Sequence, residues 1–498
     1  MLWFFFYGQK HRDESEKTSL HEDGISTYLQ YTTMSFNIAR NGAQKRVVIV
    51  GGGFGGLKVA NALRQSPYQV ILIDKNNYHQ FPPLIYQIAS AGLEPSAIAF
   101  PFRKLFHGCK NVHFRMAELR SIFPEKNIIQ TSIGKIDYDY LVLATGTTSN
   151  FFGNKHIEEE AIPMKTLSEA MGLRNALLSN LERSITCATE QERRELLNIV
   201  IVGGGATGVE IAGALSEMKR YILPADYPDM DKGLLHIYLI EAGERLLGNM
   251  SPISSQKAEK FLREMGVDVR LGELVTDYHA RQVILKDGTA IPTRTLIWVS
   301  GVKAVATDNL PEFCFGRGDR LKVDACNRTE VADNIFAIGD QCIMTCDTNY
   351  PDGHPQLAQV AIQQGKLLAQ NLIRLAHDKP MQPFRYKNLG TMATIGRNRA
   401  VAEIGCIKTQ GIVAWFLWLT VHLRPILGVR NKINILLNWI WNYFSYDQSL
   451  RIILYAKKAK EVIEREKRET VTHWGDDLKK EHDIRQEDTP EANNKPKE

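Results

Sequence analysis

The sequence lacks several features that would assign it to a broad class of proteins at once. It has no stretch of about 18 consecutive uncharged apolar residues, the length that a membrane-spanning helix needs. Its 61 basic and 56 acidic residues leave a net charge of only +5, which gives no reason to expect a nucleic-acid partner. Its seven cysteines form no CxxC pair and no disulfide framework, so a reducing compartment is favoured.

Metal-binding sequence patterns are absent as well. None of the 13 histidines belongs to an HxxxH pattern or to a clustered Cys/His pattern. There is also no Asp-x-Asp-x-Asp-Gly loop of the kind that binds calcium. The sequence therefore predicts no metal.

Both ends of the chain have the composition of unstructured segments. The apolar segment 2–7 is too short for a signal peptide, and the acidic residues that follow it are unlike a mitochondrial presequence. We expect a disordered extension over residues 1–44, in which Met34 offers an alternative start. Residues 457–498 are rich in charge and are expected to form a polar tail.

What the chain does contain is the same glycine-rich loop twice. Gly51–Gly56 follows the apolar run 46–50, and Gly203–Gly208 follows the apolar run 198–202; a helix-like stretch comes after each loop. In such a loop the first glycine allows a tight turn, the second lets the backbone approach a pyrophosphate, and the third permits close packing of helix and strand. The helix N-terminus stabilises the anion. Two loops predict two bound dinucleotides and electron transfer between them.

Each loop is followed by a second strand that ends in a carboxylate. Asp74 comes 23 residues after Gly51, and Glu241 comes 38 residues after Gly203. These acids are expected to accept hydrogen bonds from adenosine ribose hydroxyls, and Glu241 would repel a 2′-phosphate, which favours NADH over NADPH. We attribute the longer second spacing to a loop at residues 221–233, which is rich in proline and aspartate.

Each half then closes with a strand and a small-residue turn at nearly the same distance from its loop. Gly146 comes 95 residues after Gly51, and Gly301 comes 98 residues after Gly203. A further short strand, 334–340, ends in Asp340, which we expect to receive a hydroxyl of a flavin ribityl chain. Residues 356–376 show helical spacing of apolar side chains, and their N-terminal amides are expected to face a reduced flavin.

The segment after Gly411 is expected to associate with a membrane surface. Residues 412–423 are an apolar run of 12, too short to span a bilayer, and three basic residues follow before the next acid. In the next helix-like piece, 433–444, asparagines 434, 438 and 442 form one polar stripe opposite apolar side chains. Tryptophans 415, 418, 439 and 441 are expected at the headgroup boundary. A buried C-terminal helix or a dimer interface is the alternative reading.

These motifs resemble the two-dinucleotide-binding-domain flavoproteins, and among them the type II NADH dehydrogenase family, over residues 45–455. The resemblance rests on the segments 76–87, 203–210 and 358–365 and on Lys387 with 390–396. The pair Gln359 and Gln363 is the most specific of these signals. The resemblance implies an α/β fold with two Rossmann-like, glutathione-reductase-like domains and C-terminal amphipathic membrane-anchoring helices.

The resemblance also implies a division of the chain. We expect the FAD-binding domain over 45–160 and 306–400, the NADH-binding domain over 161–305 and a membrane-association region over 401–456. The implied reaction is hydride transfer from NADH to FAD and two-electron reduction of a membrane quinone, ubiquinone or menaquinone, without proton pumping. The expected setting is the cytoplasmic face of the cell inner membrane, where a peripheral respiratory-chain enzyme contacts lipid through residues 411–446 and forms a homodimer.

The resemblance assigns roles to particular residues. Glu210, Gln359 and Gln363 are the expected catalytic residues: Glu210 faces the nicotinamide region, and the two glutamines contact the quinone or hold its tunnel. For Glu210, charge stabilisation at a helix N-terminus is an equally good explanation. The expected cofactor-binding residues are Gly51, Gly53, Phe54, Gly55, Gly56, Asp74, Lys75, Thr145, Gly146, Asp340, Ala358, Gln359 and Lys387 for FAD, and Gly203, Gly205, Gly208, Glu241 and Gly301 for NADH.

Two other activities are compatible with paired dinucleotide loops. A soluble NADH-dependent reductase of an electron-carrier protein would share both loops but would not need the C-terminal helices. A sulfide:quinone reductase would use a cysteine pair, for which Cys342 and Cys346 are candidates, although packing as small apolar residues is the simpler role for them. A disulfide reductase is excluded, because no cysteine lies between Asp74 and Phe100.

Overall fold

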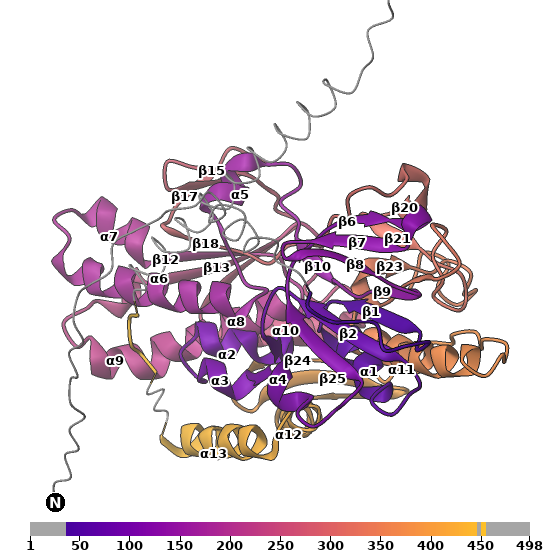
Figure 1. Cartoon of the computed structure of the whole chain (residues 1–498). Helices are drawn as coiled ribbons and strands as arrows, with labels where there is room; N and C mark the ends of the chain where they lie inside the picture. The colour runs from indigo at the N-terminus through magenta and orange to yellow at the C-terminus, as the bar shows by residue number, and fades with distance from the viewer. Residues whose placement is uncertain (1–35, 446–449, 455–498) are drawn as a thin grey trace, which may run out of the picture. The chain divides into compact units, whose positions relative to one another are not determined.

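The computed structural model of the chain describes residues 36–445 and 450–454 (Figure 1). These residues form two compact units. Unit 1 takes the described residues before Gln80 together with Phe100–Thr148 and Val302–Asn388. Unit 2 takes Gln80–Ala99, Ser149–Gly301 and the described residues from Leu389 onward. The domain boundaries expected from the sequence stay predictions. The expected polar tail and residues 1–35 of the expected disordered extension lie outside the described residues. Residues 36–44 of that extension are described and form part of unit 1, where Phe36 is buried in the core and Arg40 pairs with Asp139.

Unit 1 is built on a five-stranded parallel sheet in the order β22-β9-β1-β2-β5. The strands are β1 (Arg46–Val50), β2 (Gln69–Asp74), β5 (Val112–Met116), β9 (Tyr140–Leu143) and β22 (Ile335–Ala337). Strand β1 is buried on both faces, as its continuous apolar run predicts. Strand β22 pairs in parallel with β9, which confirms that the segment after residue 334 returns to the first sheet.

Unit 1 also contains helices α1 (Phe54–Ala62) and α11 (Ala358–Leu375) and two small sheets, one antiparallel and one mixed. Helix α1 follows the first glycine loop and packs against α11, which lies within the predicted helix at 356–376. The strands β6 (Leu119–Phe123), β7 (Ile128–Thr131) and β8 (Gly134–Asp137) form an antiparallel sheet. Another small sheet joins β20 (Phe315–Gly316), β21 (Arg320–Lys322) and β23 (Cys342–Ile343).

Unit 2 repeats the same sheet order with a second set of strands. Its parallel sheet runs β11-β18-β12-β13-β14, and β12 is formed by the second apolar run, 198–202. These strands are β11 (Ile162–Pro163), β12 (Asn198–Val202), β13 (His236–Glu241), β14 (Val267–Leu271) and β18 (Thr295–Trp298). In both sheets the loop-bearing strand lies between the strand that ends in the carboxylate and the strand that closes the half. The predicted duplication of Rossmann-like sheets is confirmed.

Helices cover this second sheet. They are α6 (Leu167–Thr186), α7 (Glu190–Leu197), α8 (Ala206–Glu217) and α10 (Pro252–Glu264). Thr166 begins α6 with a capping box, because its side chain accepts from the Glu169 amide and the Glu169 side chain bonds back to the Thr166 amide. The antiparallel sheet of β15 (Val275–His279), β16 (Gln282–Leu285) and β17 (Ala290–Pro292) belongs to the same unit, as does the short helix α5 (Lys155–Glu160).

The loop expected at residues 221–233 is only partly a loop. A π-helical turn at Met218–Ile222 extends α8, and α9 (Leu223–Asp226) follows it. The prediction is wrong at this end because Ile222 and Leu223 are buried, so their packing outweighs the turn signal of the nearby prolines.

The C-terminal part of unit 2 is a three-stranded antiparallel sheet followed by two helices. The strands are β24 (Thr391–Gly396), β25 (Arg399–Ile404) and β26 (Ile407–Gln410). Helices α12 (Ile412–Leu423) and α13 (Val429–Ser445), at the yellow end of the colour scale in Figure 1, match the two amphipathic segments predicted there. Among the described residues, no helix is both long enough and apolar enough to cross a bilayer.

Candidate functional site: two dinucleotide loops and a buried carboxyl group

The two glycine loops have the same construction. Gly51 and Gly203 both adopt left-handed backbone conformations, with φ of 102° and 116°. A Cβ on Gly51 would lie 2.2 Å from the carbonyl oxygen of Ala144, and one on Gly203 would lie 2.8 Å from that of Val299. Each first glycine is therefore required both by its turn and by the neighbouring strand end.

The third glycine of the pattern is equally constrained in both loops. A Cβ on Gly56 would lie 1.9 Å from the oxygen of Gly51, and one on Gly208 would lie 1.9 Å from the oxygen of Gly203. In contrast, a Cβ on Gly53 or on Gly205 would meet no atom within 4 Å. Each loop is thus open at the N-cap residue that precedes its helix, where a phosphate group would approach the amides.

A carboxylate fastens each loop from the end of the adjacent strand. The amide of Gly52 donates to Asp74 Oδ2 over 2.7 Å, and the amide of Gly204 donates to Glu241 Oε2 over 2.5 Å. The second oxygen of each acid also accepts an amide, from Asn76 in one case and from Gly243 in the other, both over 2.7 Å. Desolvation raises the pKa of Asp74, although these amides act in the opposite direction.

The residues expected around the remainder of FAD lie at the same end of the first sheet. The Thr145 hydroxyl donates to Gln341 Oε1 over 2.6 Å, and Gly146 has a φ of 71°. The Thr147 hydroxyl donates to Asp340 Oδ2 over 3.4 Å. The closing turn and the segment that carries Asp340 are thereby joined within unit 1. Phe54 begins α1, and Lys75, directly after Asp74, is exposed.

Two residues near this end were missed from the sequence. His79 is buried, and its Nδ1 lies 2.9 Å from the carbonyl oxygen of Gly52, so it supports the loop from the other side. Gln364 is 1% exposed, and its Oε1 accepts the amide of Gly339 over 2.7 Å. Gln364 follows Gln363 in the sequence, but its spacing gave no sign that its side chain would bind the backbone at Gly339, just before Asp340.

The paired glutamines of α11 are placed on its first turns. The Gln363 side chain makes two bonds to the backbone of Lys387: its Nε2 donates to the carbonyl oxygen over 2.9 Å, and its Oε1 accepts the amide over 3.0 Å. Gln363 therefore fixes the chain at Lys387, whose side chain is exposed. Ala358 begins the helix, and Gln359 is half-buried.

Glu210 lies in the interior of unit 2. It projects from α8, which rests on β24, and the backbone N–H of Thr394 faces its carboxyl group. The indole Nε1 of Trp418 also faces the carboxyl group; it has no partner of good hydrogen-bond geometry among the described residues. Burial raises the pKa of Glu210 to about 8, even though both N–H groups act to lower it. At neutral pH the carboxyl group is largely protonated and can donate a hydrogen bond.

A cavity of about 120 Å³ adjoins this carboxyl group. That is less than the roughly 300–1,000 Å³ of a typical ligand site, so it has room for one end of a ligand. Its lining combines acids with aromatic side chains and with residues from α12 and α13: Tyr86, Gln87, Glu210, Glu217, Thr394, Arg397, Trp415, Trp418, Trp439, Asn442 and Tyr443 among others.

Trp415, Trp418 and Trp439, from the C-terminal helices, line this cavity. Trp418 is 1% exposed and stacks on His422 with ring centroids 4.2 Å apart. Trp439 donates through Nε1 to Gln87 Oε1 over 2.9 Å. Trp415 and Trp439 are half-buried, and Trp441 is 64% exposed, so a headgroup position stays a prediction for these three. The prediction of a headgroup position is wrong for Trp418, because its ring fills the space above Glu210.

The two cysteines proposed for the sulfide:quinone alternative, Cys342 and Cys346, lie in different surroundings. Cys342 is buried, and desolvation raises the pKa of its thiol to about 12. Cys346 is exposed. A thiol with such a pKa is a poor nucleophile, so Cys342 behaves as a small apolar residue.

Comparison with known proteins assigns this arrangement to a family. Residues 45–365 match the pyridine nucleotide-disulphide oxidoreductase family, and residues 388–445 match the NDH2 C-terminal domain. A type II NADH:quinone oxidoreductase of Mycobacterium tuberculosis is 32% identical over 419 residues, which cover 80% of this chain and 88% of that protein. The chain belongs to the type II NADH:quinone oxidoreductases.

Solved structures agree with this assignment at the level of the fold. The structure of NDH2 from Plasmodium falciparum in complex with NADH is similar with a TM-score of 0.75 and 20% identity, over 83% of this chain and 100% of that one. The sulfide:quinone oxidoreductase of Aquifex aeolicus gives a TM-score of 0.62 and 21% identity, over 81% of this chain and 96% of that one. The type II family membership confirms the resemblance inferred from the motifs, including the two Rossmann-like domains.

Proposed function

We propose that this protein oxidises NADH through bound FAD and reduces a membrane quinone, without pumping protons. The observation that carries the proposal is the pair of glycine loops, one in each unit, each open at the start of a helix and each fastened by a carboxylate. Membership of the type II NADH:quinone oxidoreductases supports the same reaction.

FAD fits unit 1. The free space above Gly53 and the amides at the start of α1 suit a pyrophosphate, with Gly51, Phe54, Gly55 and Gly56 shaping the approach. When bound, FAD accepts a hydride from NADH and passes the electrons to the quinone. The residues that would hold its remaining parts are Asp74 and Lys75 at the ribose, Thr145 and Gly146 near the phosphates, Asp340 at the ribityl chain, and Ala358, Gln359 and Lys387 around the flavin ring.

NADH fits the second loop in the same manner. Gly203, Gly205 and Gly208 shape the phosphate site, and Gly301 closes the half with a φ of 82°. The Glu241 carboxylate already accepts two backbone amides, and its remaining lone pairs are free to accept ribose hydroxyls. A negative charge at this point disfavours a 2′-phosphate, so NADH is the preferred substrate.

Glu210 is proposed to act on the ligand that enters the cavity beside it. A carboxyl group with a pKa of about 8 carries a proton at neutral pH and can donate it, or a hydrogen bond, to an oxygen atom placed in the cavity. The carboxamide oxygen of the nicotinamide is such an acceptor, in keeping with the expectation that Glu210 faces the nicotinamide region. Gln359 and Gln363, on α11 of unit 1, are proposed to contact the quinone or to hold its tunnel, Gln363 by fixing the backbone at Lys387.

The outer face of α12 and α13 is proposed to lie on a lipid surface. Asn442 points inward, where its Nδ2 donates to Asn438 Oδ1 over 2.7 Å and to the carbonyl oxygen of Gly92 over 3.5 Å. Basic residues flank the face at 424, 430 and 432. The opposite side of the helices exposes Ile412, Val413, Phe416, Val421, Val429, Ile433, Leu436, Leu437, Ile440, Trp441 and Phe444. Such a surface suits peripheral attachment to a membrane. Two further points remain predictions: that the membrane face is the cytoplasmic face of an inner membrane, and that a homodimer presents two such surfaces.

Stopped-flow absorbance of the purified protein tests the proposal. NADH should bleach the flavin rapidly, and a short-chain quinone added next should restore its absorbance rapidly. Bleaching without reoxidation by quinone would instead indicate a reductase of an electron-carrier protein. Bleaching by sulfide but not by NADH would indicate the sulfide:quinone reaction.

A further inference from the structure

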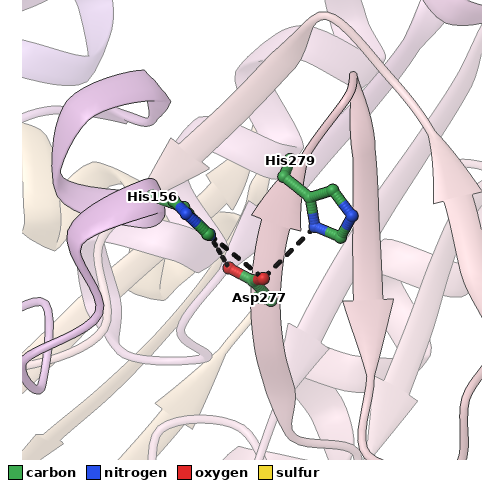
Figure 2. Close-up of side chains that lie close together, drawn as sticks. All are labelled: His156, Asp277 and His279. Carbon is green, nitrogen blue, oxygen red and sulfur yellow. Dashed lines mark hydrogen bonds and ion pairs between the residues drawn. The ribbon is translucent and has the colours of Figure 1, made fainter.

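Three side chains from two distant segments of the chain meet in unit 2 (Figure 2). His156 lies in the first turn of α5, and Asp277 and His279 lie on β15. Because Asp277 and His279 are two residues apart on a strand, they project from the same face of the sheet. The sequence shows no metal-binding pattern, because His156 is 121 residues from Asp277.

The three groups are at ligand-like separations. His156 Nδ1 lies 3.2 Å from both carboxylate oxygens of Asp277, and His279 Nδ1 lies 3.2 Å from Oδ2. One ligand atom from each residue lies within 4.8 Å of the others. Two ligands about 2.0–2.1 Å from a tetrahedral zinc ion are about 3.3 Å apart, so the His–Asp separations of 3.2 Å are those of such a site.

Neighbouring groups orient the central carboxylate. Asn154, the N-cap of α5, donates through Nδ2 to Asp277 Oδ1 over 3.1 Å and to the carbonyl oxygen of Thr276 over 2.9 Å. The amide of Tyr278 donates to Asp277 Oδ1 over 2.8 Å. Burial alone would raise the pKa of Asp277, but hydrogen bonds from Asn154, His156 and Tyr278 outweigh it and hold the pKa at about 2. The carboxylate is therefore ionised, and its orientation is fixed by hydrogen bonds, as is usual for carboxylates that bind metals.

The cluster is also accessible. The side chains of His156 and His279 are 60% and 56% exposed, and that of Asp277 is 28% exposed. A metal ion can therefore reach it, and water can complete the coordination. Two imidazole nitrogens and one carboxylate oxygen are a donor set for zinc, copper or nickel rather than for magnesium or calcium, which prefer oxygen ligands.

We propose that His156, Asp277 and His279 bind one divalent transition-metal ion, of which Zn²⁺ is the reference case, contrary to the sequence-based expectation of no metal. The ion would join the start of α5 to β15 and so tie the helix to the edge of the antiparallel sheet. Without a metal, the same side chains would contribute little to the stability of the fold, because an exposed ion pair stabilises a protein by at most about 1 kcal/mol.

The test is metal titration of the untagged, chelator-treated full chain at neutral pH, by calorimetry and by thermal melting. One Zn²⁺ per chain should bind in the wild type and raise the melting temperature, whereas Mg²⁺ should not. His156→Ala, His279→Ala and Asp277→Asn should each weaken binding by at least about tenfold. His236→Ala, which removes an exposed histidine of β13, is the matched control and should bind as the wild type does.

Electron paramagnetic resonance of the Cu²⁺-loaded protein gives a second readout. The wild-type spectrum should show coupling to two imidazole nitrogens, and each histidine variant should lose one of them. Failure to bind Zn²⁺ stoichiometrically would overturn the proposal. So would binding that is unchanged in all three variants, since it would place the ion elsewhere, for example on the exposed thiols of Cys346 and Cys406.

Discussion

The Cβ position of Gly213 lies 1.8 Å from the carbonyl oxygen of Ile395, so α8 can rest on β24 only if residue 213 has no side chain. The atoms nearest to that position all belong to the backbone of Ile395, so no flexible side chain could move to make room. Because Glu210 on α8 faces the amide of Thr394 on β24, the same close approach sets the surroundings of the buried carboxyl group.

Gly213→Ala should therefore push α8 and β24 apart. We expect a loss of stability of about 1–3 kcal/mol, the usual cost of overpacking, and a slower reduction of the flavin by NADH. Gly172→Ala on α6 is the matched control, since a Cβ there meets nothing within 4 Å, and it should stabilise the protein by about 0.5–1 kcal/mol. Urea denaturation of both variants measures the difference; equal stabilities would show that the helix and strand separate without cost.

Glu210→Gln should change how stability depends on pH. The ordinary pKa of a glutamate is 4.5, and that of Glu210 is about 8. Between these values the folded protein keeps a proton that the unfolded chain has lost, so Glu210 makes stability fall as pH rises through this range. The glutamine cannot ionise, and its advantage over the wild type should grow to the order of a few kcal/mol by about pH 8.

Melting temperatures of the two proteins measured from acidic to mildly basic pH test this expectation. A constant difference across the range would mean that Glu210 is ionised in the folded protein. In the same variant, reduction of the flavin by NADH should slow more than folding weakens if Glu210 acts on the substrate, and an unchanged rate would remove it from the mechanism.

Glu241→Gln should relax the preference for NADH. Glutamine keeps an oxygen that can accept the amide of Gly204, but it removes the negative charge that opposes a 2′-phosphate. We expect the ratio of kcat/KM for NADPH to that for NADH to rise by about tenfold, equivalent to about 1.4 kcal/mol. Glu244→Gln, an exposed change three residues away, is the control. An unaltered ratio would mean that another group selects the cofactor.

Charges on the outer face of α13 should weaken attachment to lipid. Leu437→Glu with Phe444→Glu removes two of the exposed apolar groups, at 59% and 78% exposure, and adds repulsion from anionic headgroups. Sedimentation with anionic vesicles should show at least a tenfold loss of binding, while bleaching of the flavin by NADH stays unchanged. Ile253→Glu, which changes an exposed apolar residue of α10, should bind vesicles as the wild type does. Equal binding of the double variant would place the lipid contact elsewhere.

The sequence was sufficient for those parts of the fold that depend on local patterns. A strand, a tight glycine turn and a helix follow one another along the chain, so β1 with α1 and β12 with α8 could be predicted from spacing. The C-terminal helices could be predicted for the same reason, since their apolar and polar positions recur at the helical period.

The surroundings of Glu210 could not be predicted in this way. Tyr86, Thr394 and Trp418 reach its cavity from segments that are distant in sequence, and no periodicity encodes such a meeting. Trp418 was assigned to the lipid boundary because a tryptophan in an amphipathic helix has the same local pattern whether its ring faces lipid or a cavity. The cluster of His156, Asp277 and His279 could not be predicted for a related reason. Its members are brought together only by the packing of α5 against β15.

The carboxylate clamps on the two loops also bear on how cofactor preference can change during evolution. Glu241 holds the amide of Gly204 and is also the residue whose charge we propose to discriminate between NADH and NADPH. A lineage cannot discard the charge without loosening the turn unless the replacement still accepts that amide. A shift toward NADPH is therefore open to a replacement such as glutamine, which still accepts the amide of Gly204 and carries no charge.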